Sequence, residues 1–505
     1  EASYCEDFAM PEEKRLVMIS PRFPIYSTSS GMPFCRVFNL LKVFLKNGFK
    51  VYSLYLQEYD QVKVKSYQEE MARCGDIQFV HMPREVSSCV EYLSSLDADY
   101  IWLTDIWEEQ QYAFFEELAR GIKEECAGPL VFGAMNVKAK SNLRTFFESR
   151  NYKDLHRAQR FYDMEKKIFS HADYVTVFTE KEKLAVRSLF PGASATVIPH
   201  MYRLTEVGRG FEERENICFI GNMEHFHDLD AVKYFVDEIF PFILEKYPDI
   251  EFHVIGSDPQ KFSGNWASDN IKIYGDVEDI YETLSHYKLF VCPMNFAVGR
   301  KSEIGFVMNA GIPLVATPTG AEGFDITDGQ EGYLEKEAYQ FANKCIRCLE
   351  SRERWEYFSA MTRKSLAQHN SINIVSSLLK AFFHEKVMKG FPQRKYSLPM
   401  EVERTLDEES PEAYNAYGDG AYEKGDYECA EVWYKKALKE NEYPSYAEAA
   451  VARGRDGEAL ELLKRSVVTI GQAYRGRAAV AEKIGDSRDA KEYFELAVKI
   501  NPAFE

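Results

Sequence analysis

Two glycines that could bring backbone amides to a phosphate are the first residues of this chain whose placement could do chemistry. Gly221 comes directly after Cys218-Phe-Ile, and Gly31 ends the turn-rich segment Ser29-Ser30-Gly31. A glycine after a strand lets backbone amides approach a diphosphate and places its charge against the N-terminus of the next helix. Most strand-to-helix turns use a glycine for geometry alone. Neither glycine therefore identifies a phosphate site by itself.

Two polar residues follow apolar segments nearer the start of the chain. Asp105 ends the segment Tyr100-Ile-Trp-Leu-Thr-Asp, and Asn136 follows Leu130-Val-Phe-Gly-Ala. Ligands of parallel sheets gather at the carboxyl ends of the strands, so both residues are candidates for contact with a substrate. For Asp105 the alternative is that its side chain caps the next helix.

Two short motifs suggest metal or redox chemistry, and both have simpler interpretations. Asp228-Leu-Asp230 and Asp97-Ala-Asp99 are D-x-D pairs, which arise often by chance, and the first lies in the expected first turn of a helix, where acids offset the dipole. Cys345 and Cys348 form a C-x-x-C without a second pair or a histidine at ligand spacing. We expect no metal, and ordinary packing of these cysteines.

These residues need elements to position them, and the first 200 residues alternate strand-like and helical segments. The segment from about residue 34 to 47 is amphipathic and predicts a helix. Such alternation predicts a parallel sheet covered on both faces. The expected strands lie in Arg15-Leu-Val-Met-Ile-Ser-Pro, Gly48-Phe-Lys-Val-Tyr-Ser-Leu-Tyr-Leu, Tyr100-Ile-Trp-Leu-Thr-Asp, Pro129-Leu-Val-Phe-Gly and Asp173-Tyr-Val-Thr-Val-Phe-Thr.

The same alternation restarts after Pro199 and the polar stretch 205–215. A restart after a linker predicts a second Rossmann-like domain, with a cleft between the carboxyl edges of the two sheets. We place the domains at residues 1–203 and 204–394. The five expected strands lie in Asn216-Ile-Cys-Phe-Ile-Gly, Ile250-Glu-Phe-His-Val-Ile-Gly, Ile271-Lys-Ile-Tyr-Gly, Leu289-Phe-Val-Cys-Pro and Ile312-Pro-Leu-Val-Ala-Thr.

The last hundred residues contain a repeated helical pattern. The pattern is a Gly-Asp pair followed by an alanine, an aromatic residue and a second alanine. It occurs as Gly425-Asp426, Ala430, Tyr434 and Ala437 and again as Gly485-Asp486, Ala490, Phe494 and Ala497. A weaker copy between them contains Gly454, Ala459 and Leu463. Pro411 to Pro444 spans one unit near the length of a tetratricopeptide repeat. We predict a linker at 395–409 and an all-α tetratricopeptide-repeat domain of three helical pairs at 410–505. An unrelated helical bundle is the alternative.

Composition limits the classes of function. A chain of 505 residues with 45% apolar residues can bury several cores, and its net charge of -18 repels nucleic acid. No apolar stretch reaches the length of a membrane span, and the first residues lack the pattern of a signal peptide. Its ten scattered cysteines suit reduced thiols in a cytosol. We therefore expect a soluble cytoplasmic protein.

An ordered series of motifs resembles the group-one glycosyltransferases of the GT-B fold. The resemblance covers roughly residues 14–385. It includes the Ser29-Ser30-Gly31 loop and Ala172-Asp-Tyr-Val-Thr-Val-Phe-Thr-Glu, and then Phe219-Ile-Gly-Asn-Met-Glu-His-Phe-His-Asp, His253-Val-Ile-Gly-Ser, Tyr274-Gly-Asp-Val-Glu-Asp, Val291-Cys-Pro, Ala310-Gly-Ile-Pro-Leu-Val-Ala-Thr and Gly320-Ala-Glu-Gly.

The resemblance implies an α/β protein with two Rossmann-like domains in the GT-B architecture, in which Gly31 and Gly221 face each other across a nucleotide-sugar donor. It also implies that a helix dipole and basic side chains, without a metal, stabilise the leaving diphosphate. Arg300 and Lys301 are the residues here that could supply that charge, and Ser302 could cap the helix that ends at Gly311. A solvated Arg-Lys pair is the alternative. Our donor-side candidates are Gly31, Gly221, Asn222, Gly256, Lys272, Arg300, Lys301, Ser302 and Glu322.

This sequence departs from the family at its pair of glutamates. The two glutamates are replaced here by Val298 and Phe306. At the position where the family usually has a basic residue, this chain has Glu303. Glu303 lies one turn before Phe306 on nearly the same helical face and could reach the ribose instead. With Asp105 and Asn136 on the acceptor side, Glu303 completes our catalytic candidates. His200, at the junction of the two domains, could be a hinge residue or contact the ligand.

Three functions remain open. The first is a transferase, metal-independent and of retaining outcome by resemblance, that moves a sugar from a nucleotide sugar to a glycan or protein. The second is a catalytically silent GT-B module that binds a ligand or a protein, and the third is another reaction, such as epimerisation, on the same scaffold. In the first case the repeats would recruit the acceptor or a protein partner. They could instead form a dimerisation arm or a brace on the second domain.

Overall fold

A computed structural model describes residues 14–24, 36–206, 208–223, 225–256, 269–295, 301–387, 411–423, 427–439, 441, 443–452, 454–484 and 487–504. Contacts group the described residues into two compact units. The α/β unit lies within residues 1–137, 164–183 and 193–392, and the helical unit lies within 138–163, 184–192 and 393–505. The predicted linker at 395–409 lies outside the described residues, and the predicted domain boundaries remain predictions.

The first sheet of the α/β unit has seven parallel strands in the order β3-β2-β1-β4-β5-β6-β7. Its central strands are buried apolar runs, as a sheet covered on both faces requires. The strands are β1 (Lys14–Ser20), β2 (Phe49–Tyr55), β3 (Ile77–His81), β4 (Tyr100–Thr104), β5 (Leu130–Gly133), β6 (Tyr174–Val177) and β7 (Ala195–Val197). The helices between them are α1 (Arg36–Lys46), α2 (Gln61–Ala72), α3 (Val86–Ser95), α4 (Glu109–Glu125), α5 (Lys138–Ser149), α6 (Tyr152–His171) and α7 (Glu180–Leu189).

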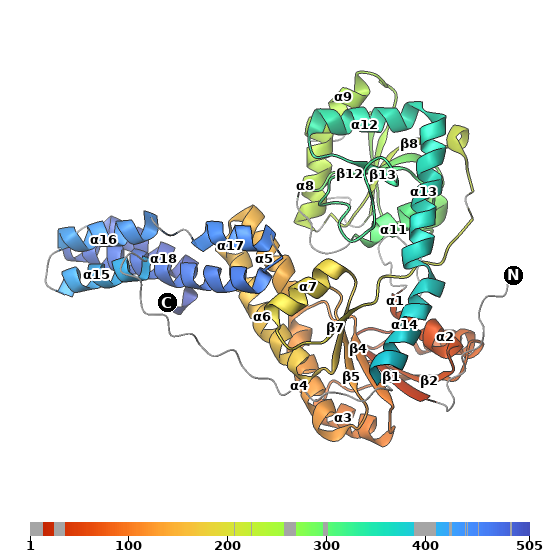
Figure 1. Ribbon diagram of the computed structural model, residues 1–505, viewed down its shortest axis with the longest axis horizontal. Helices are drawn as coiled ribbons and strands as arrows, with labels where there is room; N and C mark the ends of the chain where they lie inside the picture. Colours follow the sequence, from red (N-terminus) through yellow and green to blue (C-terminus); the bar gives the residue numbers. More distant parts are fainter. Residues whose placement is uncertain are drawn as a thin grey trace. The chain divides into compact units, whose positions relative to one another are not determined.

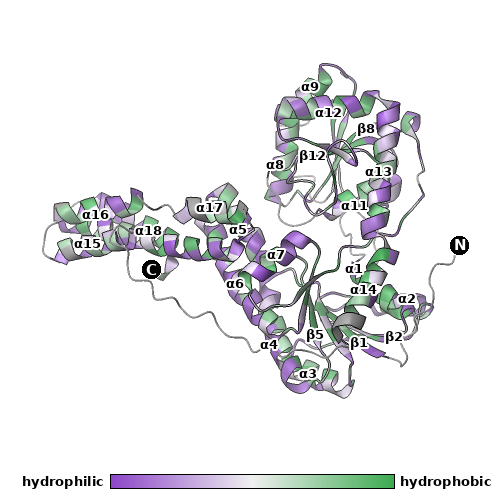
Figure 2. Ribbon diagram, in the orientation of Figure 1, coloured by the Kyte–Doolittle hydropathy of each residue, from purple (hydrophilic) through white to green (hydrophobic). Residues whose placement is uncertain are grey.

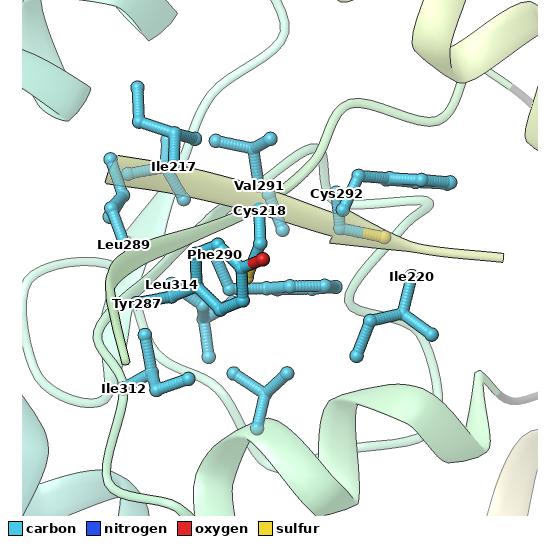
Figure 3. Close-up of a cluster of buried hydrophobic side chains, with 14 of the residues drawn as sticks. Ile217, Cys218, Ile220, Tyr287, Leu289, Phe290, Val291, Cys292, Ile312 and Leu314 are labelled. Atoms are coloured by element: carbon cyan, nitrogen blue, oxygen red, sulfur yellow. The ribbon is translucent and has the colours of Figure 1, made fainter. Parts of the chain in front are cut away.

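The second sheet has six parallel strands in the order β10-β9-β8-β11-β12-β13. Figure 3 shows its core, where side chains of β8 and β11 pack with Ile312 and Leu314. The strands are β8 (Glu215–Ile220), β9 (Phe252–Ile255), β10 (Ile271–Tyr274), β11 (Tyr287–Cys292), β12 (Leu314–Ala316) and β13 (Gly332–Leu334). The helices are α8 (Phe226–Tyr234), the π-helical turn η2 (Phe235–Ile239), α9 (Phe240–Leu244), α10 (Ile280–Leu284), α11 (Ser302–Asn309), α12 (Ala338–Glu350), α13 (Arg352–Asn370) and α14 (Ile372–Val387).

The prediction of two parallel sheets with helices, followed by a helical C-terminal region, is confirmed. Helix α14 comes after the second sheet in the sequence, but its apolar residues join the core of the first sheet (Figure 1). Cys345 and Cys348 are both buried in α12, and burial raises the pKa of the Cys348 thiol to about 12. The expected number of five strands in the second sheet was too low, because β13 is only three residues long and begins with a glycine.

Hydropathy follows these layers. Figure 2 shows hydrophobic residues along the central strands and mixed faces along the helices. Among the described residues, no helix is both long enough and apolar enough to cross a membrane.

The helical unit contains the C-terminal helices α15 (Pro411–Glu423), α16 (Tyr427–Lys439), α17 (Tyr443–Ala452), α18 (Asp456–Ile484) and α19 (Ser487–Ile500). Tyr434 of α16 packs where two small residues leave room, because a β-carbon at Gly418 or at Gly476 would lie within 2.6 Å of its ring. Ala437 and Ala497, the last alanine in each copy of the repeated pattern, are fully buried. The repeated Gly-Asp pairs lie outside the described residues, and the tetratricopeptide assignment remains a prediction.

The expectation of three separate helical pairs was wrong in one respect. Helix α18 runs unbroken for 29 residues, where a turn between the second and third pair was expected. A glycine inside a helix costs only about 1 kcal/mol, so Gly471 does not end α18. A β-carbon at Gly471 would lie 2.6 Å from the ring of Phe504, which explains a glycine there.

The helical unit also includes segments of α5, α6 and α7. The Gly457 amide at the start of α18 donates to Ser188 Oγ at 2.9 Å, and the Lys464 ammonium lies 4.7 Å from the ring of Tyr162. The Tyr162 ring in turn stacks on Phe190. The first half of α18 is therefore attached to α6 and α7.

Candidate functional site

Two glycines bring the loops after β8 and β9 into backbone contact. Gly256 has a φ of 143°, and a β-carbon there would lie 1.8 Å from the carbonyl oxygen of Gly221. A β-carbon at Gly221 would lie 2.7 Å from the Phe219 ring and 3.0 Å from Cγ of Asp228. Both positions therefore need glycine. The structure brings these two predicted donor-side residues together at the carboxyl edge of the second sheet.

Asp228 organises the polar groups at this edge. Its buried carboxylate accepts the Asn222 amide hydrogen at 3.0 Å and lies 3.0 Å from the Lys301 ammonium. His227 Nε2 lies 3.7 Å from the same carboxylate. Burial, together with the charge of Lys301, lowers the pKa of His227 to about 4. A cation and a backbone amide thus converge beside Gly221, and the imidazole next to them is neutral at pH 7.

The D-x-D motif is used within the protein. Asp228 takes the contacts just described, and Asp230 Oδ2 accepts a hydrogen bond from the side-chain amide of Asn295 at 3.2 Å. No group of three or more potential metal ligands occurs in the part of the chain that the structure describes.

The first turn of α11 carries the next three candidates. The helix begins at Ser302, so Lys301 rather than Ser302 occupies the N-cap position. Glu303 is half-buried, and loss of hydration raises the pKa of its carboxyl group, against the charge of Lys301. Cys292, at the end of β11, is fully enclosed, and burial raises the pKa of its thiol to about 12.

Phe306, which replaces a glutamate of the family, is part of the core. Its side chain is 7% exposed, and its ring meets those of Tyr202 and Tyr281 edge-on at 5.5 and 5.6 Å. The other replaced position, Val298, lies outside the described residues, as do Gly31 and Arg300.

The last two donor-side candidates, Glu322 and Lys272, lie at opposite edges of the second sheet. Glu322 follows β12 and lies 3.5 Å from the Lys181 ammonium, with its side chain 16% exposed. Nearby Gly320 must be a glycine, because a β-carbon would lie 2.4 Å from the Cys292 carbonyl oxygen. Lys272, in contrast, forms an ion pair at 3.7 Å with Glu251, which precedes β9. The structure therefore places Lys272 toward the amino edge of the sheet, away from Gly221.

The first sheet also ends in a cluster of polar residues. Asp105 follows β4 with an unusual φ of 64°, is 6% exposed and accepts the indole N–H of Trp107 at 2.7 Å. Burial raises the pKa of its carboxyl group to about 6, although the Trp107 bond and the charges of Arg22 and Arg36 act in the opposite direction. Glu108, not Asp105, caps α4. The capping alternative for Asp105 is therefore wrong.

Two neighbouring strands add to this cluster. Asn136 follows β5, and its side-chain oxygen is buried without a hydrogen-bond partner among the described residues. The ring of His200, after β7, lies 4.1 Å from that of Phe178, after β6. Asp105, Asn136 and His200 thus all follow strands of the first sheet at the edge where ligands of such sheets bind.

Sequence reasoning missed Arg36. Its guanidinium is buried at the start of α1, 3.9 Å from the ring centre of Phe178 and within hydrogen-bond distance of the Met135 sulfur. It also acts on the pKa of Asp105. In the sequence Arg36 is only one polar residue at the start of an amphipathic helix, and no motif distinguished it.

Comparison with known proteins agrees with this architecture. Residues 214–351 match the family model described as glycosyl transferases group 1. No curated protein matches the chain.

Several solved structures have the same fold at low sequence identity. HepE of Anabaena, in complex with UDP and glucose, is 12% identical with a TM-score of 0.54, and the match covers 74% of this chain and 100% of that chain. A TarM mutant of S. aureus, in complex with Fondaparinux, alpha-GlcNAc-glycerol and UDP, is 12% identical with a TM-score of 0.56, covering 73% and 99%. Sucrose-phosphate synthase of Thermosynechococcus elongatus is 13% identical with a TM-score of 0.53, covering 75% and 100%.

These likenesses establish the fold and place the matched segment on the second sheet, where Gly221, Asp228 and Lys301 lie. The chain has the GT-B fold, and its residues 214–351 are similar to the glycosyl transferases of group 1.

Proposed function

We propose that this protein transfers a sugar from a nucleotide-sugar donor to an acceptor and that the donor diphosphate binds beside Gly221, Asn222 and Lys301. One observation carries this proposal: a mostly enclosed ammonium group, on a side chain 11% exposed, and a backbone amide converge on a single carboxylate, that of Asp228, at the carboxyl edge of the second sheet. These are the two kinds of donor that stabilise a diphosphate without a metal. HepE and TarM, which share the fold, were both crystallised with UDP.

In this mechanism the leaving nucleoside diphosphate gains negative charge as the bond to the sugar breaks. Lys301 supplies the balancing charge, and the amides that follow Gly221 supply hydrogen bonds. Glu303 takes the ribose contact for which the family uses a glutamate at the position of Phe306. We expect retention at the anomeric carbon, as the resemblance implies.

The acceptor binds at the carboxyl edge of the first sheet in this proposal. Asp105 has a pKa of about 6, close to the range in which a carboxyl group exchanges protons at neutral pH. Asn136 offers a buried amide oxygen with no partner in the described part of the chain. Asp105 would accept the proton of the attacking hydroxyl group, and Asn136 would orient the acceptor.

A second candidate function is supported by Phe306. A buried aromatic ring where the family has a carboxylate favours a GT-B module that binds a ligand or a protein without catalysis. Calorimetry with UDP, ADP and GDP, followed by donor hydrolysis across nucleotide sugars, separates the two functions. We expect binding of one nucleotide and slow hydrolysis of its sugar conjugate. Binding without turnover of any donor would favour the silent module, and no binding of any nucleotide would contradict the proposal.

We further propose that the C-terminal helices recruit a macromolecular acceptor or a partner protein. The supporting observation is exposed apolar surface on α15, α16 and α19, where Tyr417, Val432 and Phe494 are 44%, 59% and 45% exposed. Removal of residues 405–505 tests this role. We expect the truncated protein to stay folded, bind nucleotide and hydrolyse donor, but to lose transfer to its acceptor. Unchanged transfer, or collapse of the whole protein, would show that these helices are structural.

A further inference from the structure

The segment that connects the two sheets runs along α11, the helix that carries Lys301 to Glu303 at its start. At the far end of α11, the buried side chain of Asn309 donates to the carbonyl of Arg203 at 2.8 Å and accepts the amide of Thr205 at 3.1 Å. The guanidinium of Arg363 binds the carbonyls of Thr205 and Asn309. These bonds hold the connecting segment to the C-terminal end of α11.

Tyr202, in the same segment, holds the other end of the helix. Its hydroxyl donates to the carbonyl oxygen of Ser302, the first residue of α11, at 3.0 Å. Its ring fills the space left by Gly305, where a β-carbon would lie 2.0 Å from Cζ of Tyr202. The side chain is 4% exposed and also packs edge-on against Phe306. The first turn of α11 is thus in contact with a residue that belongs to neither sheet.

The backbone of Tyr202 is itself fixed from the start of α14. Its amide donates to the carbonyl of Asn370 at 2.8 Å, and the Asn370 side chain donates to the carbonyl of His200 at 2.9 Å. Tyr202 also forms a parallel bridge with Ser371. Since α14 begins at Ile372 and packs in the core of the first sheet, Tyr202 sits where the chain leaves that sheet and where it returns.

We propose that Tyr202 is a positioning residue that sets the first turn of α11, and with it Lys301, relative to the amide of Asn222. This inference rests on the proposed diphosphate site. The physical reason is that Lys301 directly precedes Ser302, whose carbonyl accepts the Tyr202 hydroxyl hydrogen. A shift of this carbonyl would move the Lys301 ammonium away from the Asn222 amide. A hydrogen bond and a filled volume act on the same turn from the connecting segment.

Tyr202→Phe separates the hydroxyl group from the ring. The variant keeps the ring in the space above Gly305 and loses only the bond to Ser302. We expect about three- to tenfold weaker UDP binding by calorimetry, with little change in melting temperature. Hydrogen exchange of the ligand-free protein should become faster in the peptide 301–309 and stay unchanged in the sheets. Tyr333→Phe is the matched control, because it removes the hydroxyl that accepts a hydrogen bond from Arg354 in the same core, and it should leave both readouts unchanged.

Gly305→Ala tests the filled volume. The added methyl group must displace the Tyr202 ring, so the variant should show both the weaker UDP binding and the faster exchange. In a Tyr202→Ala background the same methyl group meets empty space, and Gly305→Ala should then have little further effect. Full additivity of the two substitutions in a double-mutant cycle would show that they act independently.

The outcomes separate this inference from the proposed function. If UDP binds the protein and Tyr202→Phe changes neither affinity nor exchange, the positioning role is wrong. If UDP does not bind the unmodified protein, the proposed diphosphate site fails for this nucleotide, and exchange of the peptide 301–309 still decides whether Tyr202 fixes the turn. Unchanged exchange in Tyr202→Phe would overturn the inference in that case too.

Discussion

Both sheets bury a carboxyl group at their carboxyl edge, and the two groups have different surroundings. Asp228, 4% exposed, lies against an ammonium group and a backbone amide. Asp105, 6% exposed, accepts one indole N–H and has a pKa of about 6 because burial outweighs its favourable contacts. The first arrangement fixes the place of a positive charge. The second gives a carboxyl group a pKa close to neutral pH, so that it can lose and regain its proton there.

The difference indicates a division of labour between the sheets. In the proposed function, the second sheet binds the donor through the ammonium group of Lys301 and the amide of Asn222, and the first sheet carries the group that exchanges a proton. Substitutions at the two edges should therefore change different measured quantities.

The largest effect is expected from Asp105→Asn. Loss of a general base costs about 100- to 10,000-fold in rate, so transfer should fall by that amount while nucleotide affinity stays the same. In the unmodified protein the transfer rate should rise with pH through about 6, as Asp105 loses its proton. Steady-state rates from pH 5 to 8 check both statements. A full rate in the variant would remove Asp105 from the mechanism.

The stability of the same variant is a control for misfolding. The pKa of Asp105 is about 6 in the folded protein, against 3.8 for an unperturbed aspartate. Between these values the folded state therefore binds more protons than the unfolded state. The contribution of Asp105 to stability therefore falls as pH rises from about 4 to about 6. Asparagine tolerates the positive φ at this position. At pH 8 the variant should be more stable by up to about 3 kcal/mol, and at pH 3 the difference should vanish.

An effect of similar size, on binding rather than on rate, should follow removal of the basic pair. Replacing Arg300 and Lys301 by Ala should weaken nucleoside-diphosphate binding by about 1.5–3 kcal/mol for each charged hydrogen bond lost. Lys344→Ala is the control, since the Lys344 side chain is 18% exposed and also forms an ion pair, with the exposed carboxylate of Asp328 at 3.2 Å. Equal affinity in the double variant and the control would contradict the diphosphate assignment.

A smaller effect is expected from Glu303→Gln. If Glu303 replaces the missing ribose-facing carboxylate, affinity for the nucleotide should fall about three- to tenfold, as for one hydrogen bond. Affinity for inorganic diphosphate, which has no ribose, should stay unchanged. A nucleotide complex with Phe306 stacked on the ligand and Glu303 turned to water would refute this role.

The smallest expected effect is that of pH on donor binding. His227, beside Lys301, has its pKa lowered to about 4, so it stays neutral between pH 5 and 8. Affinity for an intact nucleotide sugar should then be nearly constant over this range, while the transfer rate changes. Titration calorimetry at three pH values measures it. A marked fall in affinity toward pH 8 would show that a group near the diphosphate site titrates in this range.

The sequence predicted the parts of this molecule that depend on local pattern. Apolar runs predicted most of the strands, and the glycines that follow them made Gly221 and Gly256 donor-side candidates, because a short strand and a tight turn leave direct marks in composition. Their mutual backbone contact was not predicted. It did not predict Arg36 or the position of Lys272. Which edge of a sheet a side chain reaches depends on strand register, and the environment of Arg36 is made by residues 99 and 142 positions away.

The same limit applies to the role of Asp228. Its place in a first helical turn predicted an acid that offsets the helix dipole, and a D-x-D suggested a metal ligand. The structure places Asp228 in the first turn of α8, as predicted, and also pairs its carboxylate with Lys301, 73 residues later in the chain. A long-range ion pair of this kind leaves no periodic signal in either segment.

The unbroken helix α18 has a mechanical consequence. At 1.5 Å per residue its 29 residues form a rod about 43 Å long. Its first half is attached to α6 and α7 through Ser188 and Tyr162, and Gly476 in its second half packs against Tyr434. Because the helix is continuous between these two attachment points, the distance between them stays constant. A proline introduced near residue 471 would kink or break α18 and make this distance variable.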